Sequence, residues 1–215
     1  MNKRIIYVKT PKTGGTSVEE ILRQANKPYI RIDGKTRRWP SESQLKDYGI
    51  IIVGDIVARK FRKRFLSLWS EAASFTIVRN PYDKLVSAWK YCPSTRDKPL
   101  QDALSVNLPK RKWWKKYNHD YVHFSMRQKD FVVEKNSIIV DYLVRFENLQ
   151  KDLANFFLQH NMNLPPLPHR NRIRSTDSSI PNFTPEVLTL IEDRFGADFD
   201  FFGYDRRMPL NCLPS

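Results

Sequence analysis

Short apolar runs alternate along the chain with segments whose apolar residues recur at helical spacing. Three runs, at residues 5–8, 49–53 and 74–78, are rich in β-branched and aromatic residues. Such runs are typical of strands buried on both faces of a sheet. A fourth run at 138–146 predicts one strand, or two strands with a bend, and residues 29–40 predict a short strand followed by a basic loop.

Helices are predicted between these runs. The first follows residues 5–8, ends at Pro28 and turns one apolar face inward, formed by Val18, Ile21, Leu22 and Ala25. Pro81 and Pro185 stand at favourable first-turn positions of two further helices.

Three other helix signals complete this pattern. Residues 57–68 predict a basic helix, and a helix is predicted to follow residue 148. Ser41 and Gln44 have the spacing of a capping box at the start of a short helix. Residues 92–120 are polar, basic and poorly periodic, which indicates an insertion that contacts substrate.

Strands that alternate with helices predict an α/β fold with a mostly parallel central sheet and helices on both faces. The 215 residues, 40% of them apolar, suffice for one domain with a sizeable core. We therefore expect residues 1–215 to form a single domain. No apolar run is long enough to span a bilayer, and the chain enters its first strand at once, so we expect a cytoplasmic protein.

The net charge of +14 favours a polyanionic partner. The partner could be a nucleotide, an acidic glycan, a nucleic acid or an anionic membrane. The simpler alternative is that the charge reflects a generally basic surface with no specific partner. The two cysteines and four histidines show no metal-ligand spacing, so we expect no metal site.

The most informative motif is the sequence Pro-Lys-Thr-Gly-Gly-Thr-Ser at residues 11–17, directly after the first strand. A strand, a glycine turn and a helix start in this order direct several backbone N–H groups at one point, which binds a phosphate. Lys12 precedes the glycines, whereas the P-loop of kinases and NTPases, Gly-x-x-x-x-Gly-Lys-[Ser/Thr], has its lysine after them.

A second anion site is predicted after the third apolar run. Arg79 ends that run and offers bidentate donors, and Ser87 adds a hydroxyl from the helix that follows. On that helix Ser87 shares a face with Asn80, Asp83 and Lys84, which we expect to be opposite the apolar face. A ligand with two separated phosphates would explain both sites, since ligands bind at the carboxyl ends of parallel strands.

These residues resemble a known family, the sulfotransferases that use 3′-phosphoadenosine 5′-phosphosulfate (PAPS), and within it the carbohydrate sulfotransferases. The similar blocks occur in the family's order and span most of the chain, at residues 11–17, 75–89, 145–153, 167–171 and 198–204. The resemblance implies a P-loop NTPase-like three-layer α/β fold. It also implies transfer of a sulfuryl group from PAPS to a hydroxyl, with a saccharide as the expected acceptor and no metal required.

The resemblance also assigns roles to residues. Lys12 would contact the bridging oxygen and the leaving phosphate. The 5′-phosphosulfate would be held by amides and hydroxyls of Thr13, Gly14, Gly15, Thr16 and Ser17. Arg79 and Ser87 would hold the 3′-phosphate, and a loop that includes Arg170 and Arg174 would close over the nucleotide.

Two residues are candidates for the general base. Asp55 follows the second apolar run, where related enzymes often carry a histidine, and capping of the next helix is its alternative role. His123 begins a block similar to the family's His-x-x-x-x-Gln, and a structural role is its alternative. Residues 110–117 combine cations with aromatic rings, which suits either a sugar site or a solvated basic face.

Two other functions compete with sulfuryl transfer. A P-loop-like kinase or NTPase would explain the glycine turn, but the position of Lys12 argues against it. A basic nucleic-acid-binding module would explain the charge, but it gives no reason for two ordered phosphate sites.

Overall fold

The structure, a computed structural model, describes residues 3–33, 36, 38–54, 58–110, 118–162, 165–166, 181 and 183–207. The chain divides into two compact units. Unit 1 comprises Met1–Val78 and Asp130–His169, and unit 2 comprises Arg79–Lys129 and Arg170–Ser215. Each unit has its own cluster of buried hydrophobic side chains.

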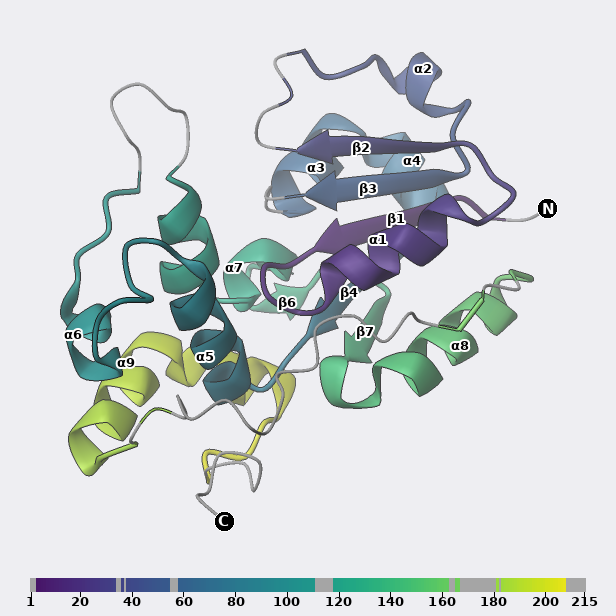
Figure 1. Cartoon of the computed structure of the whole chain (residues 1–215). Coiled ribbons are helices and arrows are strands. Elements are labelled where there is room, and N and C mark those ends of the chain that lie inside the picture. The colour runs from purple at the N-terminus through teal and green to yellow at the C-terminus, as the bar shows by residue number, and fades with distance from the viewer. Residues whose placement is uncertain are drawn as a thin grey trace. The chain divides into compact units, whose positions relative to one another are not determined.

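A five-stranded sheet forms the centre of unit 1, with the strand order β2-β3-β1-β4-β7 (Figure 1). Its strands are β1 (Ile5–Lys9), β2 (Tyr29–Asp33), β3 (Ile50–Gly54), β4 (Ala73–Val78) and β7 (Tyr142–Arg145). All four pairings in this sheet are parallel, which confirms the predicted sheet. Because β1 and β4 are parallel neighbours, the loops that follow them start from the same edge.

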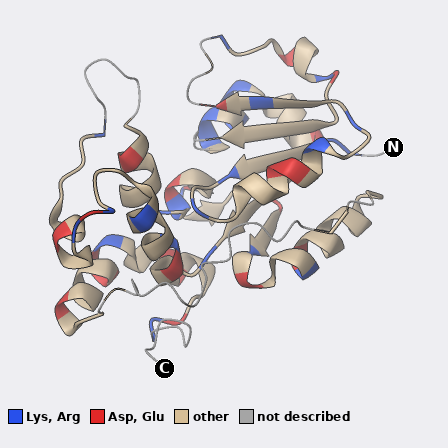
Figure 2. Cartoon of the chain, in the orientation of Figure 1, with Lys and Arg blue, Asp and Glu red and all other residues tan. Residues whose placement is uncertain are grey.

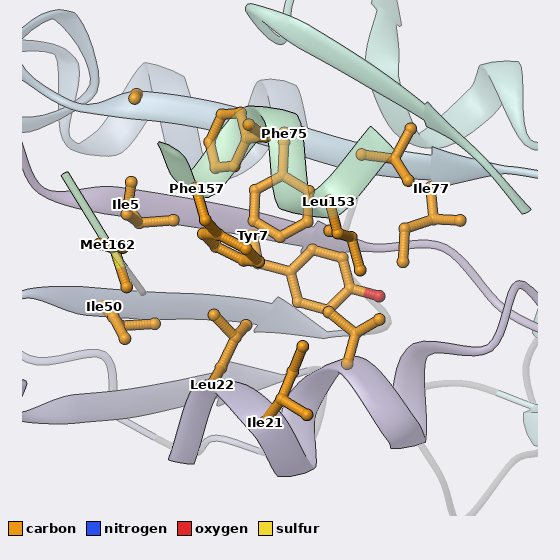
Figure 3. Close-up of a cluster of buried hydrophobic side chains, with 14 of the residues drawn as sticks. Ile5, Tyr7, Ile21, Leu22, Ile50, Phe75, Ile77, Leu153, Phe157 and Met162 are labelled. Carbon is orange, nitrogen blue, oxygen red and sulfur yellow. The ribbon is translucent and has the colours of Figure 1, made fainter. Parts of the chain in front are cut away.

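Helices flank this sheet, as the predicted α/β class requires. Helices α1 (Gly15–Arg23) and α8 (Leu149–Gln159) cover one face, where their apolar residues share a buried cluster with residues of β1, β3 and β4. Figure 3 shows Tyr7 in this cluster, where its ring stacks on Phe75 with centroids 4.7 Å apart. Figure 1 shows α3 (Ala58–Arg64) and α4 (Leu66–Glu71) behind the sheet.

The predicted basic helix at 57–68 is therefore two helices. The break lies at Phe65, whose φ of −129° and ψ of 60° leave the helical region. Its ring is buried and packs on Phe61 and Trp39, with centroid distances of 4.9 and 5.9 Å. The packing of this ring thus coincides with the interruption of the helix.

The apolar run at 138–146 contributes to two strands, which was one of the two predicted alternatives. Strand β6 (Ser137–Ile138) pairs with β5 (Val133–Glu134) in an antiparallel hairpin, and β7 joins the main sheet. Two short helices flank them, α7 (Lys129–Val132) and the 3₁₀ turn η2 (Phe146–Asn148).

The predicted capping box is present at α2 (Glu42–Leu45), where Gln44 N–H donates to the Ser41 hydroxyl at 3.2 Å.

Unit 2 is helical in its described residues. Its elements are α5 (Pro81–Tyr91), α6 (Leu100–Ser105), the π-helix η1 (Tyr121–Ser125) and α9 (Pro185–Phe202). Asn80 and Thr184 cap α5 and α9 through their side chains, and each cap is followed by the predicted first-turn proline. The cluster of this unit joins α5, α6 and α9, so part of the 92–120 segment contributes to a core.

Candidate functional site

The loop between β1 and α1 is anchored by two threonine side chains in unit 1. The Thr10 hydroxyl donates to the Ile77 carbonyl of β4, which ties the loop to the neighbouring strand. The Thr13 hydroxyl is buried and donates to the Thr10 carbonyl at 3.0 Å. The side chain of Thr13 therefore serves the loop, and its backbone N–H is the group suited to a ligand.

Two residues of this loop have the left-handed backbone conformation. Gly14 has a φ of 78° and is the N-cap of α1, with no side-chain hydrogen bond at the cap. Lys12 has a φ of 65°, which is uncommon for a residue with a side chain. Strained backbone of this kind is concentrated at functional sites, where the surrounding structure holds it in place.

The two glycines are also required by packing inside unit 1. A Cβ at Gly14 would lie 2.9 Å from the Phe146 ring, and a Cβ at Gly15 would lie 2.8 Å from the Tyr7 hydroxyl. Both distances are shorter than real Cβ contacts. The sequence predicted glycines here for the approach of a ligand, and the structure adds that the protein itself leaves no room for a side chain.

The start of α1 is suited to bind an anion. The first N–H groups of a helix have no partner within it, and they carry the positive end of the helix dipole. Ser17 N–H already donates to the Gly14 carbonyl at 3.1 Å, and Gly15 and Thr16 precede it in the first turn of the helix. Thr16 is exposed and Ser17 is half-buried, which leaves their hydroxyls near the surface. These residues fit a phosphosulfate group.

Helix α1 carries a buried carboxylate that is paired with three cations. The sequence analysis did not predict these ion pairs. Glu19 of α1 accepts from Lys9 at 2.9 Å, from Arg31 at 2.7 Å and from Arg23 at 2.9 Å. Burial acts to raise the pKa of the Glu19 carboxyl, but the hydrogen bonds and charges of Lys9 and Arg31 outweigh it and hold the pKa below its usual value. Burial likewise raises the pKa of the neighbouring Tyr7 phenol.

Arg79 comes directly after β4 and belongs to unit 2. Its backbone N–H donates to Gln128 Oε1 at 2.8 Å, and Gln128 Nε2 donates to the Arg79 carbonyl at 2.8 Å. Gln128 is fully buried. Ser87, the predicted partner of Arg79, is half-buried on α5.

Lys84 does not lie on a polar face of α5, so that part of the prediction is wrong. Its side chain is 1% exposed. Its Nζ donates to the Met126 carbonyl at 2.8 Å and lies 5.1 Å from the centroid of the Phe195 ring. The hydrogen bond and the aromatic face compensate the charge, which is the condition under which a buried lysine is stable.

His123 lies in η1 within a group of rings in unit 2. Its ring centroid is 4.2 Å from that of His119 and 5.2 Å from that of Tyr91. His119 Nδ1 lies 3.0 Å from Asp120 Oδ1. Burial acts to raise the pKa of Asp120, but hydrogen bonds from His119 and Ser94 lower it below its usual value. The group combines an ionised carboxylate with two imidazoles, which suits proton transfer.

The other predicted site residues lie outside the described residues. These are Asp55, Arg170 and Arg174, together with most of the basic aromatic run at 110–117. Among the described residues, no group of three or more His, Cys, Asp or Glu side chains is placed to hold a metal ion. Within the same part of the chain, every helix is too short or too polar to cross a membrane.

The sequence matches the profile of the Sulfotransferase family over residues 1–205. The chain therefore belongs to the sulfotransferase family, a class of enzymes for which PAPS is the sulfuryl donor. This membership agrees with the resemblance of the motifs and favours sulfuryl transfer over a kinase or a nucleic-acid-binding module.

Two solved structures are similar to this chain. One is mouse sulfotransferase SULT7A1 complexed with PAP, with 18% sequence identity, a TM-score of 0.45 and coverage of 74% of this chain and 57% of the mouse chain. The chain thus spans little more than half the length of that protein. The other is a sulfotransferase from Alicyclobacillus acidocaldarius, with 10% identity, a TM-score of 0.48 and coverage of 98% of each chain. No curated protein sequence matches the chain.

Proposed function

We propose that this chain transfers a sulfuryl group from PAPS to a hydroxyl of a carbohydrate by in-line displacement. The observation that carries the proposal is the loop before α1, where Lys12 with left-handed backbone precedes a helix start that has no side-chain cap. PAPS supplies an activated sulfuryl group on a good leaving phosphate. Within the family to which the chain belongs, this loop is the natural place for that phosphate.

The residues of the loop act on charge that develops during the reaction. The acceptor oxygen forms a bond to sulfur while the bond from sulfur to the bridging phosphate oxygen breaks, and the electron pair stays on that oxygen. Lys12 and the amides of Gly15 and Thr16 stabilise the negative charge there. Donors of this kind each contribute on the order of 3 kcal/mol to lowering a barrier.

Arg79 and Ser87 bind the 3′-phosphate in this proposal. A guanidinium makes two parallel hydrogen bonds to a phosphate, which fixes the orientation of the nucleotide. The closure of a loop with Arg170 and Arg174 over the nucleotide stays a prediction from the resemblance.

A base takes the proton that the acceptor hydroxyl loses. Asp55 and His123 are the two candidates. The rings of His119 and Tyr91 pack against the imidazole of His123, and an imidazole is a common general base in enzymes. Asp55 directly follows β3, whose carboxyl end lies beside that of β1 in the parallel sheet. The rate of transfer after replacement of Asp55 by a neutral residue, or of His123 by an apolar residue, distinguishes the two candidates.

The charge of the chain supports an acidic saccharide as the acceptor. In Figure 2 the blue of Lys and Arg colours much of the ribbon of α3, which starts shortly after β3. They are Arg59, Lys60, Arg62, Lys63 and Arg64. Together with the net charge of +14, this helix favours polyanionic chains over neutral acceptors.

A cytoplasmic location and a single domain over 1–215 stay predictions from the sequence.

A transfer assay with radiolabelled PAPS tests the proposal. The acceptors are a uronic-acid polysaccharide, a neutral oligosaccharide and a simple phenol, and all reactions contain EDTA. We expect label on the acidic polysaccharide. Label on the phenol alone would contradict a carbohydrate acceptor. Thermal shifts give the control for the donor site, because 3′,5′-bisphosphoadenosine should stabilise the protein without metal, whereas Mg²⁺-dependent stabilisation by ATP would favour the kinase.

A further inference from the structure

The side chain of Gln128 pairs with the backbone of Arg79 as one peptide group pairs with another. Its amide accepts from Arg79 N–H and donates to the Arg79 carbonyl, both at 2.8 Å. Arg79 stands between the end of β4 and the start of α5 and belongs to neither element. Gln128 supplies these hydrogen-bond partners from a position 49 residues further along the chain.

The segment that carries Gln128 is itself fixed inside unit 2. The carboxylate of Asp198 in α9 accepts from Gln128 N–H at 2.8 Å and from Lys129 N–H at 2.9 Å. Lys84 of α5 donates to the Met126 carbonyl at 2.8 Å. Gln128, Asp198 and Lys84 are all buried. Buried hydrogen bonds to charged groups are among the stronger ones in proteins.

This network determines where the backbone of Arg79 lies. A guanidinium binds a phosphate with two hydrogen bonds only when its own attachment point is fixed, since a shift of about 1 Å is enough to lose catalytic geometry. The sequence motif around Arg79 explains the side chain that meets the anion. The motif does not explain what holds the backbone of Arg79 in place. The two hydrogen bonds from the Gln128 amide explain it.

We propose that Gln128 is a positioning residue for the 3′-phosphate site, acting through the backbone of Arg79 and held by the carboxylate of Asp198. The inference rests on the proposed function, in which Arg79 binds the 3′-phosphate. Gln128 itself does not contact the nucleotide. Its removal weakens recognition of the 3′-phosphate and leaves the rest of the nucleotide site unchanged.

The test compares two nucleotides that differ only in the 3′-phosphate. Titration calorimetry gives the affinities of 3′,5′-bisphosphoadenosine and of adenosine 5′-phosphate for the wild type and for Gln128→Met. Methionine keeps the volume of the side chain and removes both hydrogen bonds to Arg79. We expect the bisphosphate to bind about tenfold more weakly, the loss typical of buried hydrogen bonds, and the monophosphate to change less than about twofold.

Two comparison variants make the result specific. Thr95→Val removes a buried hydroxyl of the same unit that donates to the Trp89 carbonyl at 3.0 Å, and it should leave the ratio of the two affinities unchanged. In Arg79→Ala, a further Gln128→Met should have no added effect on the bisphosphate, because both changes remove the same interaction. Equal losses for both nucleotides in Gln128→Met, or no loss, would overturn the inference.

Failure of the inference is distinguishable from failure of the proposed function. If Arg79→Ala lowers the affinity ratio and Gln128→Met does not, only the role of Gln128 is wrong. If Arg79→Ala leaves the ratio unchanged, the 3′-phosphate site and the inference both fall. Should Gln128→Met not fold, Gln128→Glu serves instead, since it keeps an acceptor for Arg79 N–H and loses the donor to the Arg79 carbonyl.

Discussion

The loop before α1 and the backbone of Arg79, the two regions proposed to bind the phosphate groups of the nucleotide, are built in different ways. The loop depends on its backbone conformation, since Gly14 has the left-handed conformation at the cap with no side-chain hydrogen bond there, and the Thr10 hydroxyl ties the loop to the Ile77 carbonyl of β4. Arg79 owes its position to the amide of Gln128, which is 49 residues away, and through it to Asp198, a further 70 residues away.

This difference contrasts two ways in which a chain can build an anion site. A site made of backbone amides depends on conformation, so it is sensitive to a changed φ or an added Cβ. A site made of an anchored side chain depends on a network, so it is sensitive to the loss of one buried hydrogen bond. The predictions below test the first region, as the titration of Gln128→Met tests the second.

Replacement of Lys12 should have the largest effect. Lys12→Ala removes the cation next to the leaving phosphate, and we expect kcat to fall by about 10²–10³, the loss typical of one donor to a developing anion. The fold should remain, because Lys12 is a half-buried loop residue. Initial rates with saturating PAPS, together with a thermal melt, measure the two quantities.

Lys12→Gly is the matched control for this change. Glycine adopts the φ of 65° found at Lys12 without strain, so this variant should be more stable than Lys12→Ala by about 1 kcal/mol while its activity is equally low. Turnover within twofold of the wild type in either variant would remove Lys12 from the chemistry.

A methyl group at Gly14 should have the next largest effect. In Gly14→Ala the Cβ meets the Phe146 ring at 2.9 Å and the φ of 78° becomes strained. We expect the free energy of unfolding to fall by about 2–3 kcal/mol from the sum of strain and overpacking. Urea denaturation measures it, and Phe146→Leu in the same chain should restore part of the loss.

Gly196→Ala is the comparison for Gly14→Ala. Its Cβ would lie 3.7 Å from Arg206, an ordinary contact, within helix α9. Alanine in a helix interior stabilises by about 0.5–1 kcal/mol relative to glycine. A loss of stability at position 196 equal to that at position 14 would show that the loop conformation is not the cause.

The sequence predicted the central strands and the loop because their signals are local. An apolar run such as residues 49–53 identifies a buried strand by itself, and the glycines after the first strand predict the turn that leads into the helix. Membership of the sulfotransferase family confirmed the interpretation drawn from these motifs. The carbohydrate acceptor and the assignment of single site residues stay predictions.

The remaining features depend on contacts between distant residues, which no local pattern shows. Lys84 was expected at the surface since a charged helix residue usually lies there, but the Met126 carbonyl and the Phe195 ring accommodate it in the core. Helices α6 and η1 are too short for their periodicity to be detected. The pairing of Gln128 with Arg79 likewise required the folded chain.

The smallest effect should come from the carboxylate below the loop, in Glu19→Gln. The pKa of Glu19 is held below its ordinary value of 4.5 in the folded protein, so its ionised form stabilises the fold above that pH. Loss of its charge-assisted bonds to Lys9 and Arg31 should cost about 1–2 kcal/mol at pH 7, because glutamine keeps one acceptor. Urea denaturation of both proteins measures the difference.

The pH dependence of that difference separates charge from packing. As pH falls below 4.5 and through the lower folded value, the wild type must protonate Glu19 and loses the contribution, whereas glutamine does not titrate. The gap between the two proteins should therefore close in acid. A gap that stays constant from pH 7 to strongly acidic pH would mean that Glu19 supports α1 by packing and not by its charge.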